Sequence, residues 1–119
     1  MTGATERVAA FVHATALQDL PEGVIPKAKK AIADTLAVML AGATSEVAEP
    51  LLRYVEAIDA AGEEPLLGTG LSASPECAAL VNGTFGHALD YDDVLSMIPA
   101  HPSAVILACL LYTSDAADE

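Results

Sequence analysis

The stretch NGTFGHALDYDDVLSMIPAHPS, residues 82–103, carries most of the polar chemistry of this chain. It holds the acids Asp90, Asp92 and Asp93 and two of the three histidines, His87 and His101. The residues around it are mostly Ala, Leu and Val, a composition typical of closely packed helices. We therefore expect two helices joined by an acidic connection, and we expect proton-transfer or ion-binding chemistry in that connection.

Two features of this stretch predict how it folds. His87 and Asp90 are three residues apart, so they share a face if the upstream helix continues to Asp90. Pro102 favours extended backbone at His101 and suits the first position of the next helix. The connection over 94–100 would then fold His101 back over Asp90. An ordinary solvated loop is the alternative interpretation.

The rest of the chain also predicts an all-α fold. Capping residues and apolar residues spaced by three and four predict helices over 5–17, 27–43, 45–61 or 49–61, from Pro75 into the acidic stretch, and over 104–111. We expect at most one short extended segment, near 64–69. The expected buried face of the second helix consists of Ile32, Leu36, Met39, Leu40 and Ala43. Small residues such as Gly42 would let another helix approach closely.

Length and charge narrow the class of protein. A chain of 119 residues suffices for one domain with a modest core. Seventeen acids against five basic residues give a net charge of −12, which argues against binding to nucleic acid or anionic membranes. The apolar runs are shorter than the roughly 20 residues that span a bilayer, and no signal peptide is recognisable. We expect a soluble, cytoplasmic protein in which Cys77 and Cys109 are small buried apolar residues.

Five motifs occur in a fixed order along the chain. They are DTL with AG at residues 34–36 and 41–42, LGTG at 67–70, AALVNG at 78–83, HALDYDD at 87–93 and HPS at 101–103. In this order they resemble the amino-terminal part of the MmgE/PrpD family, and the resemblance covers about residues 5–108. That family includes 2-methylcitrate dehydratase, cis-aconitate decarboxylase and iminodisuccinate epimerase.

The resemblance implies a fold and a function. It implies the beginning of a large helical domain, a homodimer when full length, and a lyase that needs no iron–sulfur cluster, so we expect no cofactor and no metal. It places the active-site aspartate on Asp90 and the histidine on His101. By resemblance, His101 transfers protons and Asp90 orients it or the substrate, while His87 and Asp93 are weaker, supporting candidates. The implied substrate is a small di- or tricarboxylate.

Two features indicate that the chain lacks parts of such an enzyme. A substrate with two or three carboxylates needs Arg or Lys partners, but Arg7 and Arg53 both lie far in sequence from the acidic stretch. We therefore expect the chain alone to be inactive. After Leu111 the sequence turns abruptly into YTSDAADE, so we expect 1–109 to form a partial helical domain and 110–119 to be a non-native or disordered tail without function.

Two other classes of function stay open. One is a divalent-metal-binding module that uses His87, Asp90, Asp93 and His101, although their spacing is neither that of an EF-hand nor that of a helical zinc protease. The other is a non-catalytic helical fragment whose apolar faces bind a partner, because 53% of the residues are hydrophobic and few elements are available to cover them.

Overall fold

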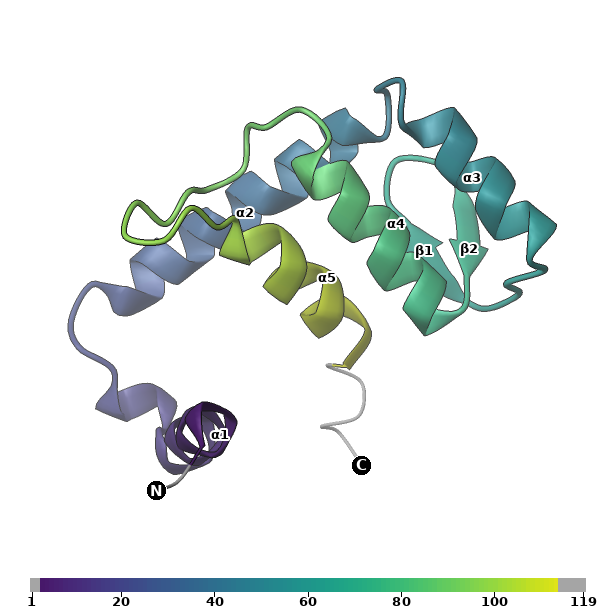
Figure 1. The fold of residues 1–119 in the computed structure, drawn as a ribbon. Helices are drawn as coiled ribbons and strands as arrows, with labels where there is room; N and C mark the ends of the chain where they lie inside the picture. Colours follow the sequence, from purple (N-terminus) through teal and green to yellow (C-terminus); the bar gives the residue numbers. More distant parts are fainter. Residues whose placement is uncertain (1–2, 114–119) are drawn as a thin grey trace. The chain divides into compact units, whose positions relative to one another are not determined.

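The computed structural model describes residues 3–113 and shows helices with one small sheet (Figure 1). The elements are α1 (Ala4–Ala14), a 3-10 helix η1 (Leu17–Asp19), α2 (Val24–Gly42), α3 (Ala48–Ala57), β1 (Glu64–Leu66), β2 (Leu71–Ala73), α4 (Pro75–His87) and α5 (Pro102–Thr113). The mostly helical class predicted from the sequence is thus confirmed. Between residues 3 and 113, no helix is both long enough and apolar enough to cross a membrane.

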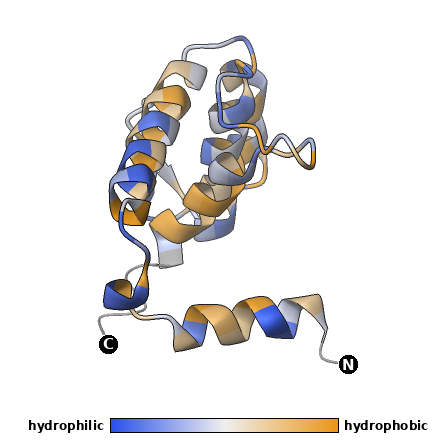
Figure 2. Ribbon diagram, turned by 90° about the vertical axis from the view of Figure 1, so that its left-hand side faces the viewer, coloured by the Kyte–Doolittle hydropathy of each residue, from blue (hydrophilic) through white to orange (hydrophobic). Residues whose placement is uncertain are grey.

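The chain divides into two compact units, one ending at Lys30 and one beginning at Ala31. In the first unit, the Gly3 amide donates a hydrogen bond to Glu6 Oε2 at 3.0 Å, which secures the start of α1. Its hydrophilic residues lie at 5–7 and at His13, and residues 8–12 between them are hydrophobic (Figure 2). Its large apolar residues Val8, Phe11 and Val12 are all exposed, and α1 buries none of its residues.

In the second unit, α4 is the central element. Ser74, with extended backbone, precedes α4, and Pro75 occupies its first position as the sequence predicts. The helix packs most extensively along α5 and also contacts α3 and both strands (Figure 1). Its buried residues are Ala78, Val81, Asn82, Phe85 and Gly86. Phe85 is the largest of the fully buried side chains, so α4 supplies the middle of the core.

The buried face of α2 agrees only in part with the one predicted: Met39 is fully buried, and Leu36 and Ala43 are partly buried against the core. Thr35, Val38, Met39 and Gly42 are buried, whereas Ile32 and Leu40 are about half exposed. The reason is a close helix contact: a Cβ atom added to Gly42 would lie 2.0 Å from the carbonyl oxygen of Phe85. Since only glycine permits this approach of two backbones, α2 turns Gly42 toward α4, together with the fully buried side chain of Met39.

The expected extended segment is one strand of an antiparallel hairpin, in which Glu64 pairs with Ala73 and Leu66 pairs with Leu71. Gly68 and Gly70 have positive φ angles, which allow the tight reversal that brings the second strand back. The sequence analysis did not predict that second strand, because three residues are too few to show an alternating pattern.

Asn82 fastens this hairpin to α4. Its Oδ1 accepts a hydrogen bond from the Leu67 amide at 2.9 Å, and its Nδ2 donates to the Pro65 carbonyl at 2.9 Å. Nδ2 also donates to the hydroxyl of Tyr112 in α5. A fully buried amide side chain thus joins three elements of the core.

The last described helix, α5, runs two residues beyond its predicted end. Only one face of it is buried, through Ala104, Leu107 and Ala108. Cys109 lies on the exposed side, so its predicted burial is wrong, and Cys77 is only partly buried. The proposed tail overlaps α5 at residues 110–113, and 114–119 lie outside the described residues.

Candidate active site

The site begins where α4 ends. His87 is the last residue of the helix, and the Asp90 amide donates to the His87 carbonyl at 3.1 Å. Asp90 then adopts a left-handed backbone with φ of 54°, a conformation that aspartate tolerates better than most residues. This turn ends the helix before Asp90, so the predicted pairing of His87 with Asp90 on one helical face does not form. The chain instead brings Asp92 back to His87.

Asp92 is the buried centre of the site. Its side chain is 0% exposed, and its two oxygens lie 3.0 and 3.1 Å from Nδ1 of His87. A buried carboxylate needs hydrogen-bond donors, and here the ring of His87, itself 54% exposed, supplies one. The sequence analysis gave Asp92 no role. No local signal in the sequence singles it out, because the direction of its side chain depends on the left-handed turn at Asp90.

His101 lies close to the same carboxylate. Its Nδ1 lies 3.3 Å from Oδ2 of Asp92, and its ring centroid lies 4.4 Å from that of His87. Nδ1 is buried, and among the described atoms it has no hydrogen-bond partner. The two imidazoles, from the end of α4 and the start of α5, thus face one shared carboxylate.

Asp90 lies on the open side of this group. Its side chain is 80% exposed, and its Oδ1 is 3.9 Å from Nε2 of His101. The predicted proximity of Asp90 and His101 is therefore present in the structure. Nε2 of His101 therefore lies near the exposed carboxylate of Asp90, and Nδ1 lies near the buried carboxylate of Asp92.

Asp93 points away from both rings. Its Oδ1 accepts from the Ser103 amide at 3.1 Å, and its Oδ2 accepts from the Ser103 hydroxyl at 2.7 Å. These contacts satisfy donors in the first turn of α5, where negative charge also complements the helix dipole. The structure therefore places Asp93 as a cap for α5 and not beside the histidines.

The segment 94–100 closes back on itself above the site. The Leu95 amide donates to the carbonyl of Ala100 at 2.9 Å, and the Ile98 amide donates to that of Leu95 at 3.1 Å. Its apolar side chains are exposed, most of all Met97 at 90%. This segment separates Asp93 from His101 in sequence while keeping both at the start of α5.

A tetrahedral zinc ion fits these residues poorly. One donor atom each from His87, Asp90, Asp92 and His101 lies within 4.8 Å of the others, and Asp92 takes the place that the sequence analysis gave to Asp93. Ligands around a tetrahedral zinc ion lie roughly 3.4 Å apart, given bonds of about 2.0–2.1 Å. The set is wider than this, and Nδ1 of His87 already contacts the Asp92 carboxylate.

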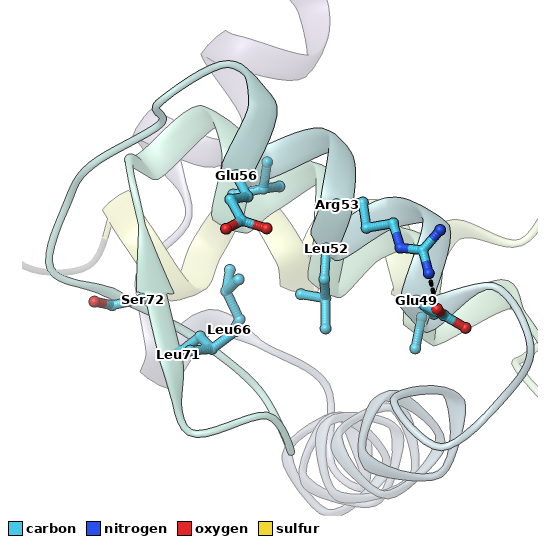
Figure 3. Close-up of a pocket in the computed structure, with 9 residues that line it drawn as sticks. Glu49, Leu52, Arg53, Glu56, Leu66, Leu71 and Ser72 are labelled. Atoms are coloured by element: carbon cyan, nitrogen blue, oxygen red, sulfur yellow. Dashed lines mark hydrogen bonds and ion pairs between the residues drawn. The ribbon is translucent and has the colours of Figure 1, made fainter.

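A separate pocket lies between α3 and the hairpin (Figure 3). Its volume is about 640 Å³, and its walls are largely apolar, with Leu52 from α3 and Leu66 from β1 among them. Arg53 and Glu49 on its rim form an ion pair with each other. Because Arg53 is the one Lys or Arg in the sequence from residue 31 to 119, the second unit has no other permanent cation for a carboxylate substrate.

His87 and His101, the two histidines of the site, each open one of the sequence motifs HALDYDD and HPS. The MmgE/PrpD N-terminal domain matches residues 6–119. The chain belongs to the MmgE/PrpD family. The match runs through residue 119, so it includes the segment that the sequence analysis set apart as a tail.

Several curated relatives are named cis-aconitate decarboxylase. Cis-aconitate decarboxylase of Mus musculus is 32% identical over 114 residues, which cover 94% of this chain and 23% of that protein. The Homo sapiens protein of the same name is also 32% identical over the same shares. That of Aspergillus terreus is 26% identical, over 96% of this chain and 23% of the relative. The chain thus spans about a quarter of the length of these relatives. No solved structure matches it.

Proposed function

We propose that this chain is part of a lyase that acts on a small di- or tricarboxylate by proton transfer, with His101 as the proton-transfer group and Asp90 orienting it or the substrate. The observation that carries the proposal is the pairing of His101 Nε2 with the exposed Asp90 carboxylate, 3.9 Å apart, in a chain of the MmgE/PrpD family. His87 and Asp93 take supporting parts, the first beside the ring of His101 and the second at the start of α5.

The named activity of the relatives makes cis-aconitate the first substrate to test. Decarboxylation breaks the bond between carbon and a carboxylate, releases carbon dioxide, and leaves an electron pair that must take a proton. Dehydration, as in 2-methylcitrate dehydratase, needs a base for a proton beside a carboxylate and an acid for the departing hydroxyl. Both reactions require a group that gives or takes a proton on the open side of the site, where His101 Nε2 and Asp90 lie.

The substrate's own charge adds a requirement. A dicarboxylate would meet the exposed Asp90, and the one cation of the second unit is already paired with Glu49. Further Arg or Lys side chains are therefore part of the proposal, as is the homodimer that the family resemblance implies. For this reason the proposed activity belongs to the complete gene product and not to these 119 residues.

The test is an assay of the complete gene product with cis-aconitate and with 2-methylcitrate. We expect His101→Ala and Asp90→Asn to lower turnover by roughly 10²- to 10⁴-fold, the usual contribution of general acid–base groups. Asparagine suits Asp90 because it also tolerates the left-handed backbone. Glu76→Gln, at the exposed start of α4, is the control. Folded His101→Ala protein with unchanged turnover of either substrate would refute the assignment.

A second candidate, a helical fragment that binds a partner, is favoured by one observation. Ile32 of α2 and Ile106 and Leu110 of α5 line a shallow apolar groove and are about half exposed. Unpartnered apolar surface of this kind is typical of interaction sites. Sedimentation of the 119-residue chain as a compact monomer at high concentration would count against this candidate.

A further inference from the structure

Two buried groups in the site face each other without a complete hydrogen bond. The Asp92 carboxylate is fully buried and takes its hydrogen bond from His87. Nδ1 of His101 is also buried, lacks a hydrogen-bond partner among the described atoms, and lies 3.3 Å from Asp92 Oδ2. Buried polar atoms rarely remain unpaired, and the nearest acceptor is the second oxygen of this carboxylate. A small rotation of the His101 ring completes the bond.

That bond would fix the state of His101. A carboxylate only accepts hydrogen bonds, so the proton of a neutral His101 must sit on Nδ1. Nε2 is then left with its lone pair on the side where Asp90 is exposed. The ring of His87, tilted by 59° with its centroid 4.4 Å away, limits rotation of the His101 ring from the other side.

We propose that Asp92 is the positioning residue of the site: it accepts the Nδ1 proton of His101 and holds Nε2 toward Asp90, while His87 anchors the carboxylate. The catalytic role of the two rings rests on the proposed function. The tautomer of His101 follows from the contacts alone and does not depend on that function. The family resemblance and the sequence pattern assign no role to Asp92. It acts through His101 and does not meet the substrate, because its side chain is buried.

The first test reads the tautomer directly in the 119-residue chain. Nitrogen chemical shifts of the imidazole rings, measured by NMR, distinguish a protonated from an unprotonated ring nitrogen. At a pH where His101 is neutral, we expect its proton on Nδ1. In Asp92→Asn the amide can donate to Nδ1, so the tautomer population should shift toward a proton on Nε2.

The matched control is Asp93→Asn. This change removes the same charge one residue away, keeps an acceptor for the Ser103 amide, and touches neither ring. The tautomer of His101 should therefore stay as in the wild-type chain. A proton on Nε2 of wild-type His101, or an unchanged tautomer in a folded Asp92→Asn chain, would overturn the proposal.

The second test uses the complete gene product and separates the two proposals. Asp92→Asn should lower kcat on the order of 100-fold, the cost of a misplaced reacting group, with little change in KM. If His101→Ala and Asp90→Asn abolish turnover but Asp92→Asn matches the wild type, the proposed function stands and the role of Asp92 is refuted. If neither substrate is turned over while the ring nitrogens behave as expected, the lyase proposal fails and the positioning of His101 by Asp92 stands.

Discussion

At the scale of single residues, polar side chains decide how the parts of the second unit meet. Asn82 is the clearest case, because a fully buried amide satisfies the Leu67 amide and the Pro65 carbonyl at once. Asp92 plays the comparable part between His87 and His101. In both cases one buried side chain connects segments that are separated in sequence, so its loss leaves several groups unpaired.

Asn82→Ala should lower the free energy of unfolding by about 2–3 kcal/mol, because it leaves the Leu67 amide and the Pro65 carbonyl without their hydrogen-bond partner. Urea denaturation measures this change. Thr84→Ala is the control in the same helix, since the Thr84 hydroxyl bonds only the carbonyl of Leu80, and it should change stability by less than about 0.5 kcal/mol. Equal stability of the two variants would show that the hydrogen bonds of Asn82 do not hold the hairpin to α4.

The sequence predicted some of these residues and not others, for a physical reason. His101 and Asp90 were expected together because the family motifs mark them and Pro102 sets the start of a helix. Asp93 was expected as a supporting site residue, but its contacts with Ser103, like the burial of Asp92, could not be predicted, because the directions of both side chains depend on the left-handed turn at Asp90. Nothing in a run of three nearby acids says which one is buried, which is exposed and which caps a helix.

At the scale of elements, the sequence predicted where helices form more reliably than which face of each helix is buried. The start of α4 at Pro75 is a local property of Ser74 and Pro75, and the structure confirms it. The buried face of α2 depends on how close α4 comes, which is set by Gly42 against Phe85. That contact joins residues far apart in sequence, so local periodicity predicted only part of the buried face.

The end of α5 is attached to α4 and the hairpin through Tyr112. Its hydroxyl approaches the carbonyl oxygens of Pro65, at 3.3 Å, and Ala78, at 3.5 Å. Burial, and next the negative charge of Glu64, raise the pKa of Tyr112 to about 12 from its ordinary 10.0. A phenolate would face carbonyl oxygens and a carboxylate, so the attachment requires the protonated hydroxyl.

This attachment should weaken at high pH. The folded chain holds the Tyr112 proton more tightly than the unfolded chain, so its contribution to stability is complete below pH 10 and is lost as pH rises to about 12. Urea denaturation of wild type and Tyr112→Phe across this pH range measures the free energy of unfolding. Only the wild type should lose the stability that the Tyr112 proton contributes. Tyr91→Phe, at an exposed tyrosine, is the control and should retain it. Parallel pH profiles for wild type and Tyr112→Phe would contradict the assignment.

At the scale of the whole molecule, charge opposes compactness. The chain carries a net charge of −12, and its acids repel one another in the folded state more than in the expanded unfolded chain. Its exposed apolar surfaces, by contrast, resemble those that bind partners. The charge and the exposed apolar surface could both be predicted from composition. The division into two units near residue 30 could not, because it falls within α2, where no Gly-, Pro- or Ser-rich linker marks it.

Added sodium chloride should therefore raise the stability of the chain, with most of the gain between low salt and about 0.1 M, where the screening length is about 10 Å. Urea denaturation at several salt concentrations measures the effect. A double variant, Glu22→Lys with Glu63→Lys, lowers the repulsion at two exposed positions and should show a weaker salt dependence. A wild-type stability that does not change with salt would mean that repulsion is not a significant term.

The segment 94–100 has a consequence for the integrity of the site. It carries the exposed Met97 between Asp92 and His101, so a protease would find an accessible peptide bond there. A cut at this point would divide the site between two polypeptides, with His87 and Asp92 on one and His101 on the other. Because α4 and α5 pack along each other, the two pieces would remain associated, and the nicked protein would keep its histidines beside one carboxylate without a covalent connection.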